Sequence, residues 1–493
     1  MSEQKITPRA TDYSQWYLDV IDAGALVDNS PVKGCMVLKP HGYAVWEAIR
    51  DDLDRRFKET GHVNAYFPLL IPQSFFSKEA AHVEGFAKEC AVVTHHRLRL
   101  ADGGGVEPDP ASKLEEPLVI RPTSETIIWH MYGKWIDSWR DLPLLINQWA
   151  NVMRWEMRTR PFLRTAEFLW QEGHTAHATS DEAQAEARQM LGVYTEFARD
   201  VLAMPSVAGA KSASERFAGA VDTYTFEVMM QNGWALQGGT SHFLGQNFAK
   251  AFDVTFQNQS GEREHVWATS WGVSTRLIGA VVMTHSDDTG LVLPPKVAPV
   301  QVAIVPIWKS DEEMASVLAF AEKVAACLKG RVRFKVDTRD GMKPGAKYFE
   351  WERKGVPLRL EIGPRDVQGN SVFAAKRTGG KKFGIPVDDG FPDAIQAQLD
   401  AIHGELLKAA EDRLAARTYT VKSYDELKAK ADAEPGFYLA GWCDDAANEA
   451  RIKEETKCTI RCYPLDQQAG AASETCFFSG RPATHRAIFA RAY

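Results

Sequence analysis

Residues 153–179 read MRWEMRTRPFLRTAEFLWQEGHTAHAT, and the rest of the chain is best understood from this stretch. Residues 146–157 and 168–178 are both rich in strand-forming side chains, so we predict two strands joined by a short basic loop. The loop region holds four arginines, from Arg154 to Arg164, which is the densest cluster of positive charge in the chain. A guanidinium group suits phosphate oxygens because it donates two parallel hydrogen bonds. Solvated arginines on a hairpin are the alternative interpretation, and this stretch alone leaves both open.

Upstream of this hairpin, a helix and a strand are predicted. Residues 42–61 carry apolar side chains at helical spacing and end at a glycine, which is typical of a helix and its C-terminal stop. Residues 63–72 are rich in strand-forming residues but contain Pro68 and Pro72, which favours a strand or an edge strand. Residues 99–117 are polar and contain several Gly and Pro residues, so we expect a surface loop there.

Downstream of the hairpin, the pattern predicts a helix and then a change of domain. The helix is expected over residues 180–204, with Ser180 as its N-cap and an acidic first turn. The proline-containing residues 291–308 indicate a linker into a second domain. Strand and helix patterns then alternate over residues 300–405, which predicts an α/β sheet. A charged helical stretch, residues 394–417, leads to a final segment that holds four of the seven cysteines.

Length and composition narrow the class of protein. At 493 residues, the chain has room for about three domains of ~150 residues each. Its 45% hydrophobic and 25% charged residues are ordinary for a globular protein and exclude disordered and collagen-like classes. No apolar stretch approaches the ~20 residues of a membrane span, and the N-terminal residues lack the order of a secretory signal. We therefore expect a cytoplasmic protein that does not enter a membrane.

Charge and cysteine content exclude two further classes. The chain has 58 Lys and Arg residues against 65 Asp and Glu residues, a net charge of −7. This balance argues against a histone-like coat of positive charge, although local Lys and Arg clusters remain able to bind phosphates. Seven cysteines in a chain of this length, an odd number, do not form a disulfide framework.

Three separated segments carry the features that chemistry needs. The first is GHVNAYFPLL (61–70), the second is the arginine-rich hairpin, and the third is WGVSTRLIGA (271–280). In the third segment, small residues open an apolar helix with Arg276 in its first turns. Each segment alone has a structural explanation: a strand containing a proline, solvated arginines, or a helix that packs closely through Gly272.

In this order, the three segments resemble the signature motifs of class II aminoacyl-tRNA synthetases. The sequence between them is similar to that of prolyl-tRNA synthetases of the archaeal and eukaryotic type, a form also found in some bacteria. Four stretches carry this resemblance: RPTSETII (121–128), FLWQEGHTAHAT (168–179), FAGAVDTYTFE (217–227) and LQGGTSHFLGQNFAKAF (236–252). The resemblance extends over nearly the whole chain.

The resemblance implies an α/β protein with three domains. Residues 1–290 would form an α+β catalytic domain, an antiparallel sheet flanked by helices. Residues 300–405 would form an α/β anticodon-binding domain, and residues 410–493 a small α+β C-terminal domain resembling a degenerate zinc-binding domain. The resemblance also implies a homodimer that uses ATP and Mg²⁺ to activate L-proline as prolyl-adenylate and then transfers the proline to tRNA(Pro).

The resemblance further implies roles for individual residues. Arg154 would bind the α-phosphate of ATP and Arg276 the triphosphate, as the two catalytic groups, and Phe168 would stack on adenine. The other expected ATP-binding residues are Glu156, Arg164, Thr165, Gln237, Thr240 and Ser274. The residues expected around proline are Thr123, Glu125, Arg154, Glu172, His174, Phe217 and His242. Those expected to bind tRNA are Arg158, Arg160, Lys354 and Arg359.

Two motif-level features set this chain apart from its wider class. The stretch between Arg164 and Arg276 leaves little room for the large editing insertion of bacterial-type prolyl enzymes, so we expect no cis-editing of alanyl-tRNA. The third motif has Thr275 where the wider class has an acidic residue, which is similar to the prolyl family.

The C-terminal cysteines depart from the zinc pattern of the family. Cys443 and Cys476 match the first member of each of its two cysteine pairs. Their partners would be Asn448 and Ser479, and neither is a good structural zinc ligand. We therefore expect no zinc, while a rescue by a cysteine of the KCTIRC segment (457–462) stays open.

Two alternative functions are weighed against this prediction. A non-catalytic class II relative that binds tRNA would usually have lost the phosphate-binding arginines, whereas Arg154, Arg164 and Arg276 are all present. The other alternative is a synthetase for threonine or serine. A threonine enzyme would need zinc-type His and Cys ligands in its pocket, and the corresponding stretch lacks a convincing set.

Overall fold

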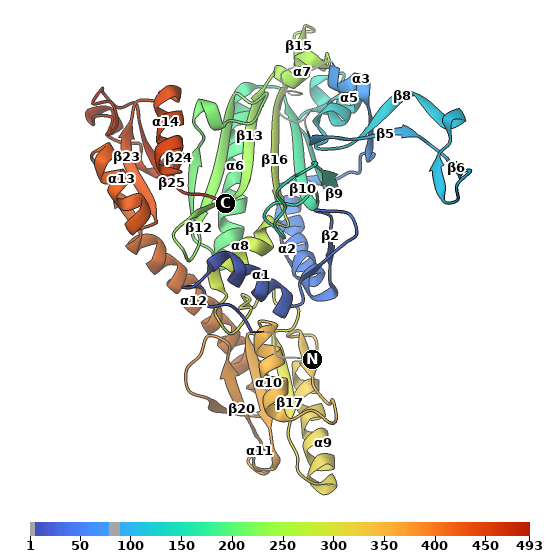
Figure 1. Cartoon of the computed structure of the whole chain (residues 1–493), viewed down its shortest axis with the longest axis vertical. Helices are drawn as coiled ribbons and strands as arrows, with labels where there is room; N and C mark the ends of the chain where they lie inside the picture. Colours follow the sequence, from blue (N-terminus) through green and yellow to red (C-terminus); the bar gives the residue numbers. More distant parts are fainter. Residues whose placement is uncertain (1–4, 78–88) are drawn as a thin grey trace.

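The computed structural model describes residues 5–77 and 89–493 and has a mixed α/β architecture. Figure 1 shows a large central unit, a second unit at the bottom of the view and a C-terminal unit beside the central one. The long helix α12 (Phe391–Ala416) runs from the second unit to the C-terminal unit. Within these described ranges, every helix is too short or too polar to cross a membrane.

One 11-stranded sheet runs through the central and C-terminal units. The strands of the central unit pair antiparallel, except that the edge strand β3 runs parallel to β9. The predicted arginine-rich hairpin is confirmed as β9 and β10, in which Met153 pairs with Glu167. In spatial order these strands are β11 (Ser206–Ala210), β12 (Asp222–Met229), β13 (Ala235–Gly245), β16 (Trp267–Ser274), β10 (Glu167–His177), β9 (Leu144–Met153) and β3 (Val63–Asn64).

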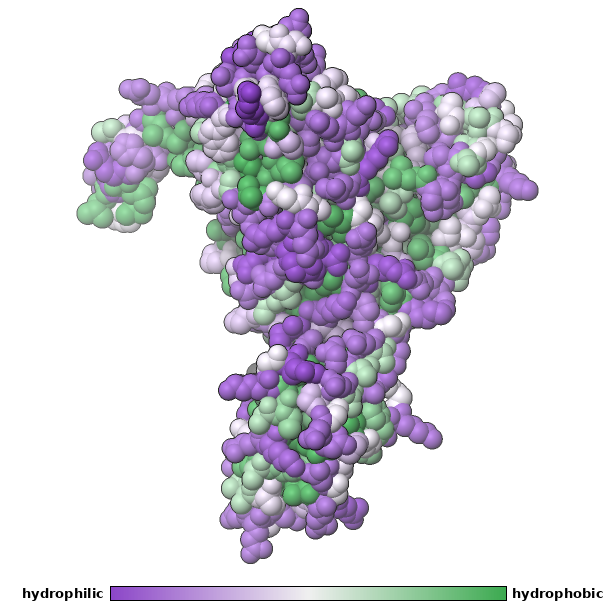
Figure 2. Space-filling model, turned by 180° about the vertical axis from the view of Figure 1, so that it is seen from behind, coloured by the Kyte–Doolittle hydropathy of each residue, from purple (hydrophilic) through white to green (hydrophobic). Residues whose placement is uncertain are grey.

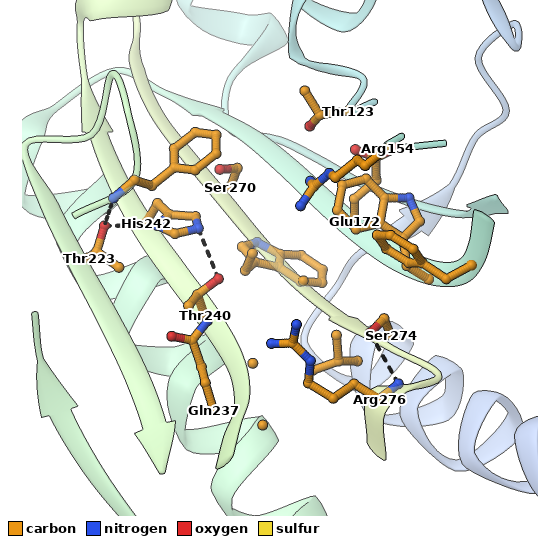
Figure 3. Close-up of a pocket in the computed structure, with 18 of the residues that line it drawn as sticks. Thr123, Arg154, Glu172, Thr223, Gln237, Thr240, His242, Ser270, Ser274 and Arg276 are labelled. Atoms are coloured by element: carbon orange, nitrogen blue, oxygen red, sulfur yellow. Dashed lines mark hydrogen bonds between the residues drawn. The ribbon is translucent and has the colours of Figure 1, made fainter. Parts of the chain in front are cut away.

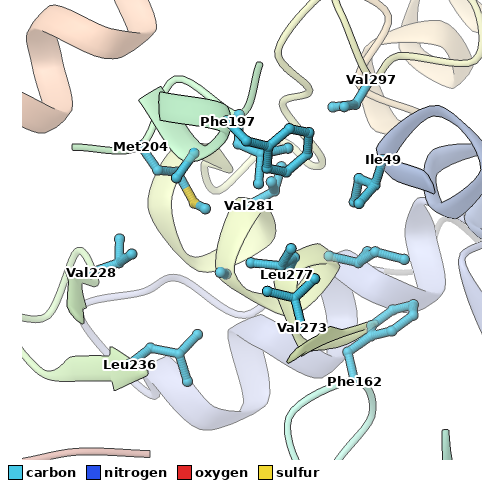
Figure 4. Close-up of a cluster of buried hydrophobic side chains, with 14 of the residues drawn as sticks. Ile49, Phe162, Phe197, Met204, Val228, Leu236, Val273, Leu277, Val281 and Val297 are labelled. Atoms are coloured by element: carbon cyan, nitrogen blue, oxygen red, sulfur yellow. The ribbon is translucent and has the colours of Figure 1, made fainter. Parts of the chain in front are cut away.

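Helices cover one face of this sheet, whereas only part of the other face is covered, by α5 (Glu125–Trp135) and α7 (Asn247–Ala251). α6 (Ser180–Asp200) packs against β12, β13 and β16, and α2 (Pro40–Glu59) and α8 (Arg276–His285) also contribute to this layer. Buried apolar side chains of these elements form the main core, part of which Figure 4 shows. Strand residues alternate between the two faces, so Gly173 and Trp271, which pair in register, both face the core. A Cβ atom on Gly173 would lie 2.1 Å from the Trp271 ring, so only glycine fits at this position.

The start of α6 differs from the prediction by one residue. We expected Ser180 as the N-cap, but Thr179 takes this place and Ser180 is the first helical residue. The Thr179 hydroxyl accepts the backbone N–H of Glu182 at 3.3 Å, and the Glu182 carboxylate accepts the backbone N–H of Thr179 at 3.2 Å. This reciprocal pair is a capping box, which satisfies two of the free donors at the helix start.

The segment over residues 99–117 is not the loop that we predicted. β6 (Leu98–Leu100) and β7 (Val106–Pro108) form a hairpin whose glycines are confined to its tip, and β8 (Lys113–Ile120) follows. The Gly and Pro content therefore predicted the turn correctly, but it gave no indication of the short strands on either side. This hairpin projects from the body and carries apolar side chains near its end, as Figure 2 shows. Among the apolar residues of the hairpin, Leu100 is 83% exposed.

Residues 63–72 form two short strands where one was expected. β3 lies at the edge of the main sheet, and β4 (Leu70–Pro72) joins a second sheet with β8 and β5 (Ala91–His95). Pro68 lies in the irregular segment between β3 and β4, where the lack of an N–H group breaks no strand pairing. Further α-helices and strands in the described part of the central unit are α1 (Tyr13–Ala23), β1 (Val27–Asn29), β2 (Met36–Leu38), α3 (Gln73–Ser77), β14 (Thr255–Gln257) and β15 (Arg263–His265).

The second unit confirms the predicted alternation of strands and helices. Its sheet has the order β18-β17-β19-β20-β21, in which the first three strands are parallel and the last two pairings are antiparallel. The elements are β17 (Val302–Pro306), α9 (Asp311–Leu328), β18 (Phe334–Val336), α10 (Pro344–Arg353), β19 (Leu358–Ile362), α11 (Pro364–Gln368), β20 (Ser371–Lys376) and β21 (Phe383–Pro386).

The C-terminal unit continues the main sheet. β24 (Thr459–Pro464) pairs antiparallel with β11, so the sheet of the central unit extends into this unit without a break. At this junction a Cβ atom on Gly209 would lie 2.4 Å from the Cβ atom of Cys462, so the glycine permits the close approach of the two strands. The other elements are β22 (Thr418–Thr420), α13 (Tyr424–Ala433), β23 (Phe437–Trp442), α14 (Ala446–Thr456) and β25 (His485–Ala490).

The end of the chain returns to the central unit. Ala492 forms a parallel bridge with Ala235 at the start of β13, and the Tyr493 hydroxyl accepts a hydrogen bond of 2.6 Å from the Asn232 side chain. The guanidinium of Arg160 lies 5.5 Å from the centre of the Tyr493 ring. The last residue therefore contacts the loop of the arginine-rich hairpin.

Candidate active site

A cavity of about 580 Å³ opens on the sheet face opposite to α6, beside the part that α5 and α7 cover. Its floor is formed by β10, β12, β13 and β16, and the start of α5 closes one end. Figure 3 shows side chains from these separate elements converging on one space. The structure brings together here every residue predicted to bind ATP or proline: Thr123, Glu125, Arg154, Glu156, Arg164, Thr165, Phe168, Glu172, His174, Phe217, Gln237, Thr240, His242, Ser274 and Arg276.

Arg154 is held in place by its backbone and by aromatic rings. Its backbone N–H donates to the Ala166 carbonyl at 2.7 Å, and its Nε donates to the Pro122 carbonyl at 3.0 Å. The guanidinium lies 5.4 Å from the Trp170 ring centre and 5.6 Å from that of Phe168. These contacts fix the direction of the positive charge before any ligand arrives.

Arg276 begins α8 and faces the same cavity. Desolvation, together with the charges of the neighbouring Arg154 and Arg164, lowers the pKa of Arg276 to about 10, so Arg276 stays charged at neutral pH. Desolvation also lowers the pKa of Arg154, against the opposing effect of nearby carboxylates such as Glu125. Because these guanidinium groups repel one another, the cavity favours a ligand with several negative charges.

Several carboxylates are distributed around these cations, among them the predicted Glu125, Glu156 and Glu172. Glu156 lies 3.7 Å from Arg164 and accepts the backbone N–H of Arg158 at 2.8 Å, so it shapes the loop of the hairpin. Glu125 and Glu172 are buried, with 4% and 3% of their surface exposed, and both lie close enough to Arg154 to favour its charged form. The cavity therefore has an acidic end at these two carboxylates and a cationic end at Arg164 and Arg276. Arg154 is within electrostatic reach of both ends.

The acidic end is an ordered hydrogen-bond network. Ser124 donates to Glu172, and the Gln148 side chain donates to the same Glu172 oxygen at 2.8 Å. Thr123 donates to Glu125, and Nε2 of His174 lies 3.3 Å from the Glu125 carboxylate. Sequence analysis missed Ser124 and Gln148, because neither residue type stands out without its partners.

One oxygen of Glu172 is left for a ligand. Within the described part of the chain, its Oε2 atom is buried and makes no hydrogen bond, as is also true of the Ser270 hydroxyl. Burial raises the pKa of Glu172, although His174 opposes this, and Glu125 raises it further. Burial lowers the pKa of His174, but the hydrogen bond and charge of Glu125 outweigh it, so the net shift is upward. A cationic group bound here would stabilise the ionised carboxylate.

An aromatic wall lines the cavity beside this network. The Phe217 ring stacks on His242 with 4.6 Å between ring centres. The two ring nitrogens of His242 each lie 3.0 Å from a threonine hydroxyl, Thr223 and Thr240, as Figure 3 shows. Burial lowers the pKa of His242 to about 4, so the imidazole is neutral at physiological pH. This wall therefore presents a flat, uncharged surface.

Comparisons with known proteins agree along the whole chain. A family model described as the tRNA synthetase class II core domain (G, H, P, S and T) matches residues 106–285. Models for an anticodon binding domain and for the prolyl-tRNA synthetase C-terminal region match residues 301–398 and 424–493. A proline--tRNA ligase of Bacteroides fragilis is 58% identical over 492 residues, and one of Porphyromonas gingivalis is 57% identical over 492 residues. In both pairs the alignment covers 99% of each chain.

The chain belongs to the prolyl-tRNA synthetase family.

Solved structures of this family have the same fold. A prolyl-tRNA synthetase from Cryptosporidium parvum, complexed with halofuginone and AMPPNP, is 39% identical with a TM-score of 0.92 and full coverage of both chains. A second structure of the enzyme from that organism, complexed with L-proline and AMP, is 38% identical with a TM-score of 0.90 and covers 98% of that chain. Both comparisons include 100% of the present chain.

The residues predicted to bind tRNA in this family member lie in two places. Arg158 is exposed beside the cavity, and Arg160 lies 5.0 Å from the centre of the Tyr17 ring. Lys354 ends α10 in the second unit and pairs with Glu350 at 2.7 Å. These residues therefore do not form one continuous surface, and their roles stay predictions.

Arg359 is far less accessible than the prediction assumed. It is 8% exposed, its guanidinium donates to Glu352 at 2.7 Å and to Glu361 at 3.1 Å, and it lies 4.1 Å from the centre of the Tyr348 ring. In this structure it organises neighbouring side chains. A direct contact between Arg359 and tRNA would require these pairs to rearrange.

Cys443, which matches the zinc pattern of the family, makes hydrogen-bond contacts with other side chains. Cys443 accepts a hydrogen bond from Arg481 at 3.2 Å and lies 3.5 Å from the Ser479 hydroxyl. Cys458 and Cys462 are both buried. Across residues 5–77 and 89–493, no three His, Cys, Asp or Glu side chains are grouped as metal ligands. The absence of zinc stays a prediction that metal analysis can test.

Sequence reasoning also missed Lys211, which lines the cavity with 2% of its surface exposed. It precedes the segment at 217–227 that carries the family resemblance, and a single lysine in a polar stretch gives no signal by itself. Its partners come from strands far apart in the sequence, so only the fold identifies it.

Proposed function

We propose that the protein is a proline--tRNA ligase that activates L-proline with ATP and transfers it to tRNA(Pro). One observation carries this proposal: guanidinium groups of Arg154 and Arg276 share a single cavity with the buried carboxylates of Glu125 and Glu172. The cationic end suits a triphosphate, and the acidic end suits an ammonium group. The close relatives named proline--tRNA ligase support the same assignment.

The first step joins two anions. A carboxylate oxygen of proline attacks the α-phosphorus of ATP, a new P–O bond forms, and the bond to pyrophosphate breaks. Arg154 offsets the repulsion between the carboxylate and the α-phosphate, and Arg276 stabilises the charge that builds up on the leaving pyrophosphate. Neither reaction partner needs to lose a proton to a side chain, so the site requires no nucleophile or general base of its own.

The acidic end positions the proline. Its secondary ammonium group can donate to the free oxygen of Glu172 and to the Thr123–Glu125 pair. The ring then lies against the Phe217–His242 wall, whose neutral imidazole does not repel the ammonium. In the second step, the 3′-terminal hydroxyl of the tRNA attacks the activated carbonyl carbon, the bond between this carbon and the phosphate oxygen breaks, and the leaving AMP phosphate takes up the hydroxyl proton.

ATP is expected to bind together with Mg²⁺. The carbonyl oxygen of Gln237 and the hydroxyl of Thr240 are hard oxygen donors on the cavity wall, the type that this ion prefers. When bound, Mg²⁺ would neutralise phosphate charge. Phe168 provides the aromatic face for adenine, and Glu156, Arg164, Thr165 and Ser274 complete the proposed nucleotide set.

Partners are proposed from the outer surfaces. The second unit, which matches an anticodon binding domain, would bind the anticodon of tRNA(Pro). A homodimer is supported by the exposed apolar side chains Val63 (60% exposed) and Tyr66 (72% exposed) at the β3 edge of the sheet. As a translation enzyme, the protein would work in the cytoplasm.

Proline-dependent exchange of pyrophosphate with ATP tests this function. The purified protein should catalyse exchange with proline, and alanine and cysteine should support it weakly, because a pocket distinguishes single methylene groups by only ~1–3 kcal/mol. No exchange with proline, under conditions where the protein is folded, would contradict the proposal. A non-catalytic tRNA-binding relative would bind tRNA and show no exchange.

A further inference from the structure

A buried ionic cluster lies beside the cavity at the junction of two units. Lys211, Glu227 and Arg461 are 2%, 0% and 8% exposed, and they come from the end of β11, from β12 and from β24. β24 belongs to the C-terminal unit, whereas β11 and β12 belong to the central unit. The junction of the sheet therefore places a C-terminal arginine next to the central unit's cavity wall.

The contacts within this cluster are close. Nζ of Lys211 donates to Glu227 Oε1 at 3.0 Å and to the backbone carbonyl of Arg461 at 2.8 Å. The Arg461 guanidinium donates to Glu227 Oε2 at 3.0 Å and lies within 2.9 Å of it through a second nitrogen. Thr225 donates to Glu227 Oε1 at 3.1 Å. Both oxygens of this carboxylate are therefore fully used.

The cluster contains two cations and one anion. A buried charge without a counter-charge is costly, so an excess positive charge beside a cavity favours a bound anion. The Lys211 ammonium has three donors, and the hydrogen bonds described above use two of them. Lys211 also lines the cavity together with Arg276, and both Glu227 and Arg461 are close enough to influence Arg276 electrostatically.

We propose that Lys211 binds a phosphate oxygen of ATP beyond the α-phosphate, and that Arg461 is a positioning residue that makes this possible. Glu227 alone would neutralise Lys211. With Arg461 on the other carboxylate oxygen, the cluster keeps a net positive charge toward the cavity. The C-terminal unit is thereby a working part of the nucleotide site. This inference rests on the proposed function, since it assumes that ATP occupies the cavity.

Nucleotide binding to the full-length protein tests the role of Lys211. Isothermal titration of Lys211→Met should show ATP binding weakened by about tenfold or more, which is ~1.4 kcal/mol, and AMP binding changed by less than about twofold. Wild-type protein is first tested for proline-dependent exchange, whose absence would count against the proposed function and not against this cluster. If ATP and AMP lose affinity equally, or if neither does, Lys211 does not bind the outer phosphates.

Steady-state exchange kinetics test Arg461. Arg461→Met should raise KM for ATP several-fold and leave KM for proline unchanged, and Arg461→Lys should restore most of the ATP affinity because it restores the charge. Arg486→Met is the matched control, because it removes an arginine of the same unit that pairs with Glu474 at a partly exposed position. Should Arg461→Met fail to fold, as judged by its melting curve, the Arg461→Lys variant decides: its KM for ATP should stay near the wild-type value, and a KM for ATP that rises together with the KM for proline would overturn the proposal. An unchanged KM for ATP in Arg461→Met would also overturn it.

Discussion

The guanidinium of Arg377 donates one hydrogen bond to each carboxylate oxygen of Asp287, both at 2.7 Å. Arg377 follows β20 of the second unit, and Asp287 lies two residues beyond the end of α8. Nε of Arg377 also donates to the carbonyls of Leu291 and Glu352 at 3.0 Å. Because α8 begins at Arg276, a single short helix connects the cavity with the attachment point of the second unit.

Replacing Arg377 should therefore affect the tRNA step more than proline activation. Arg377→Met removes charge-assisted hydrogen bonds worth about 1.5–3 kcal/mol each when satisfied, which should loosen the second unit. We expect tRNA charging to fall strongly while proline-dependent exchange falls little. Both rates are measured on one preparation, with Lys376→Met as a neighbouring control that pairs with Glu405 instead. Equal losses in both rates would show that the contact supports the whole fold.

Arg154→Ala should abolish proline activation and leave the fold intact. Loss of one preorganised donor to the reacting phosphate typically costs about 3–4 kcal/mol in the transition state, or roughly 10²–10³ in rate. The assay is proline-dependent exchange, with thermal melting to confirm folding. Arg158→Ala, an exposed residue of the same loop, should keep its exchange activity. Full activity of Arg154→Ala would remove the phosphate assignment.

Glu172→Gln should weaken proline binding selectively. The change keeps the shape of the side chain and its contacts with Ser124 and Gln148, but it removes the charge that faces the ammonium group. A charged hydrogen bond is worth about 1.5–3 kcal/mol, so KM for proline should rise by one to two orders of magnitude. KM for ATP should change little. A similar rise in both constants would point to collapse of the cavity.

The free energy of unfolding should decrease at acidic pH because His285 is buried in its neutral form. Burial lowers the pKa of this histidine to about 3, although its hydrogen bond with the Leu202 carbonyl opposes the shift. The folded state therefore holds the neutral form, and its contribution to stability is complete above about pH 6.5. It decreases as the pH falls from there toward about 3, because the unfolded chain takes up the proton first. His285→Gln should show a smaller drop in melting temperature between pH 7 and pH 5 than the wild type.

The protein should not hydrolyse alanyl-tRNA(Pro). The chain between Arg164 and Arg276 is used by β10 to β16 and by α6 and α7, which build the sheet and its helical cover. We therefore expect no separate hydrolytic unit in this stretch. The measurement is deacylation of purified mischarged tRNA over time, with buffer alone as the control. Robust hydrolysis by the purified protein would contradict this prediction.

The strands of the arginine-rich hairpin and the residues that line the cavity could be predicted from the sequence. The hairpin around Arg154 was recognisable from strand-forming residues, and the family resemblance collected residues as far apart as Thr123 and Arg276. The resemblance could do this because the motifs of a family contain the side chains that act together in its site, even where they are far apart in the sequence. Short strands such as β6 and β7 were missed, because Gly and Pro around a hairpin tip also predict a loop.

Other features depend on contacts that no local pattern encodes. Thr179, not Ser180, caps α6, since the position of Glu182 relative to the first turn decides which hydroxyl is used. Lys211 can be identified as a candidate only from the fold, in which β24 places Arg461 beside Glu227. Arg359 looked like a nucleic-acid contact from its charge, but its partners Glu352 and Glu361 are set by the folding of the second unit.

The pairing of β24 with β11 also has a practical consequence for the handling of shortened versions of this protein. If the chain were cut before the C-terminal unit, β11 would become a free strand edge with its backbone N–H and C=O groups open to other molecules. Such edges recruit strands from neighbouring chains and lead to aggregation. A truncated catalytic fragment would therefore be expected to precipitate, and its inactivity would say nothing about the chemistry of the remaining residues.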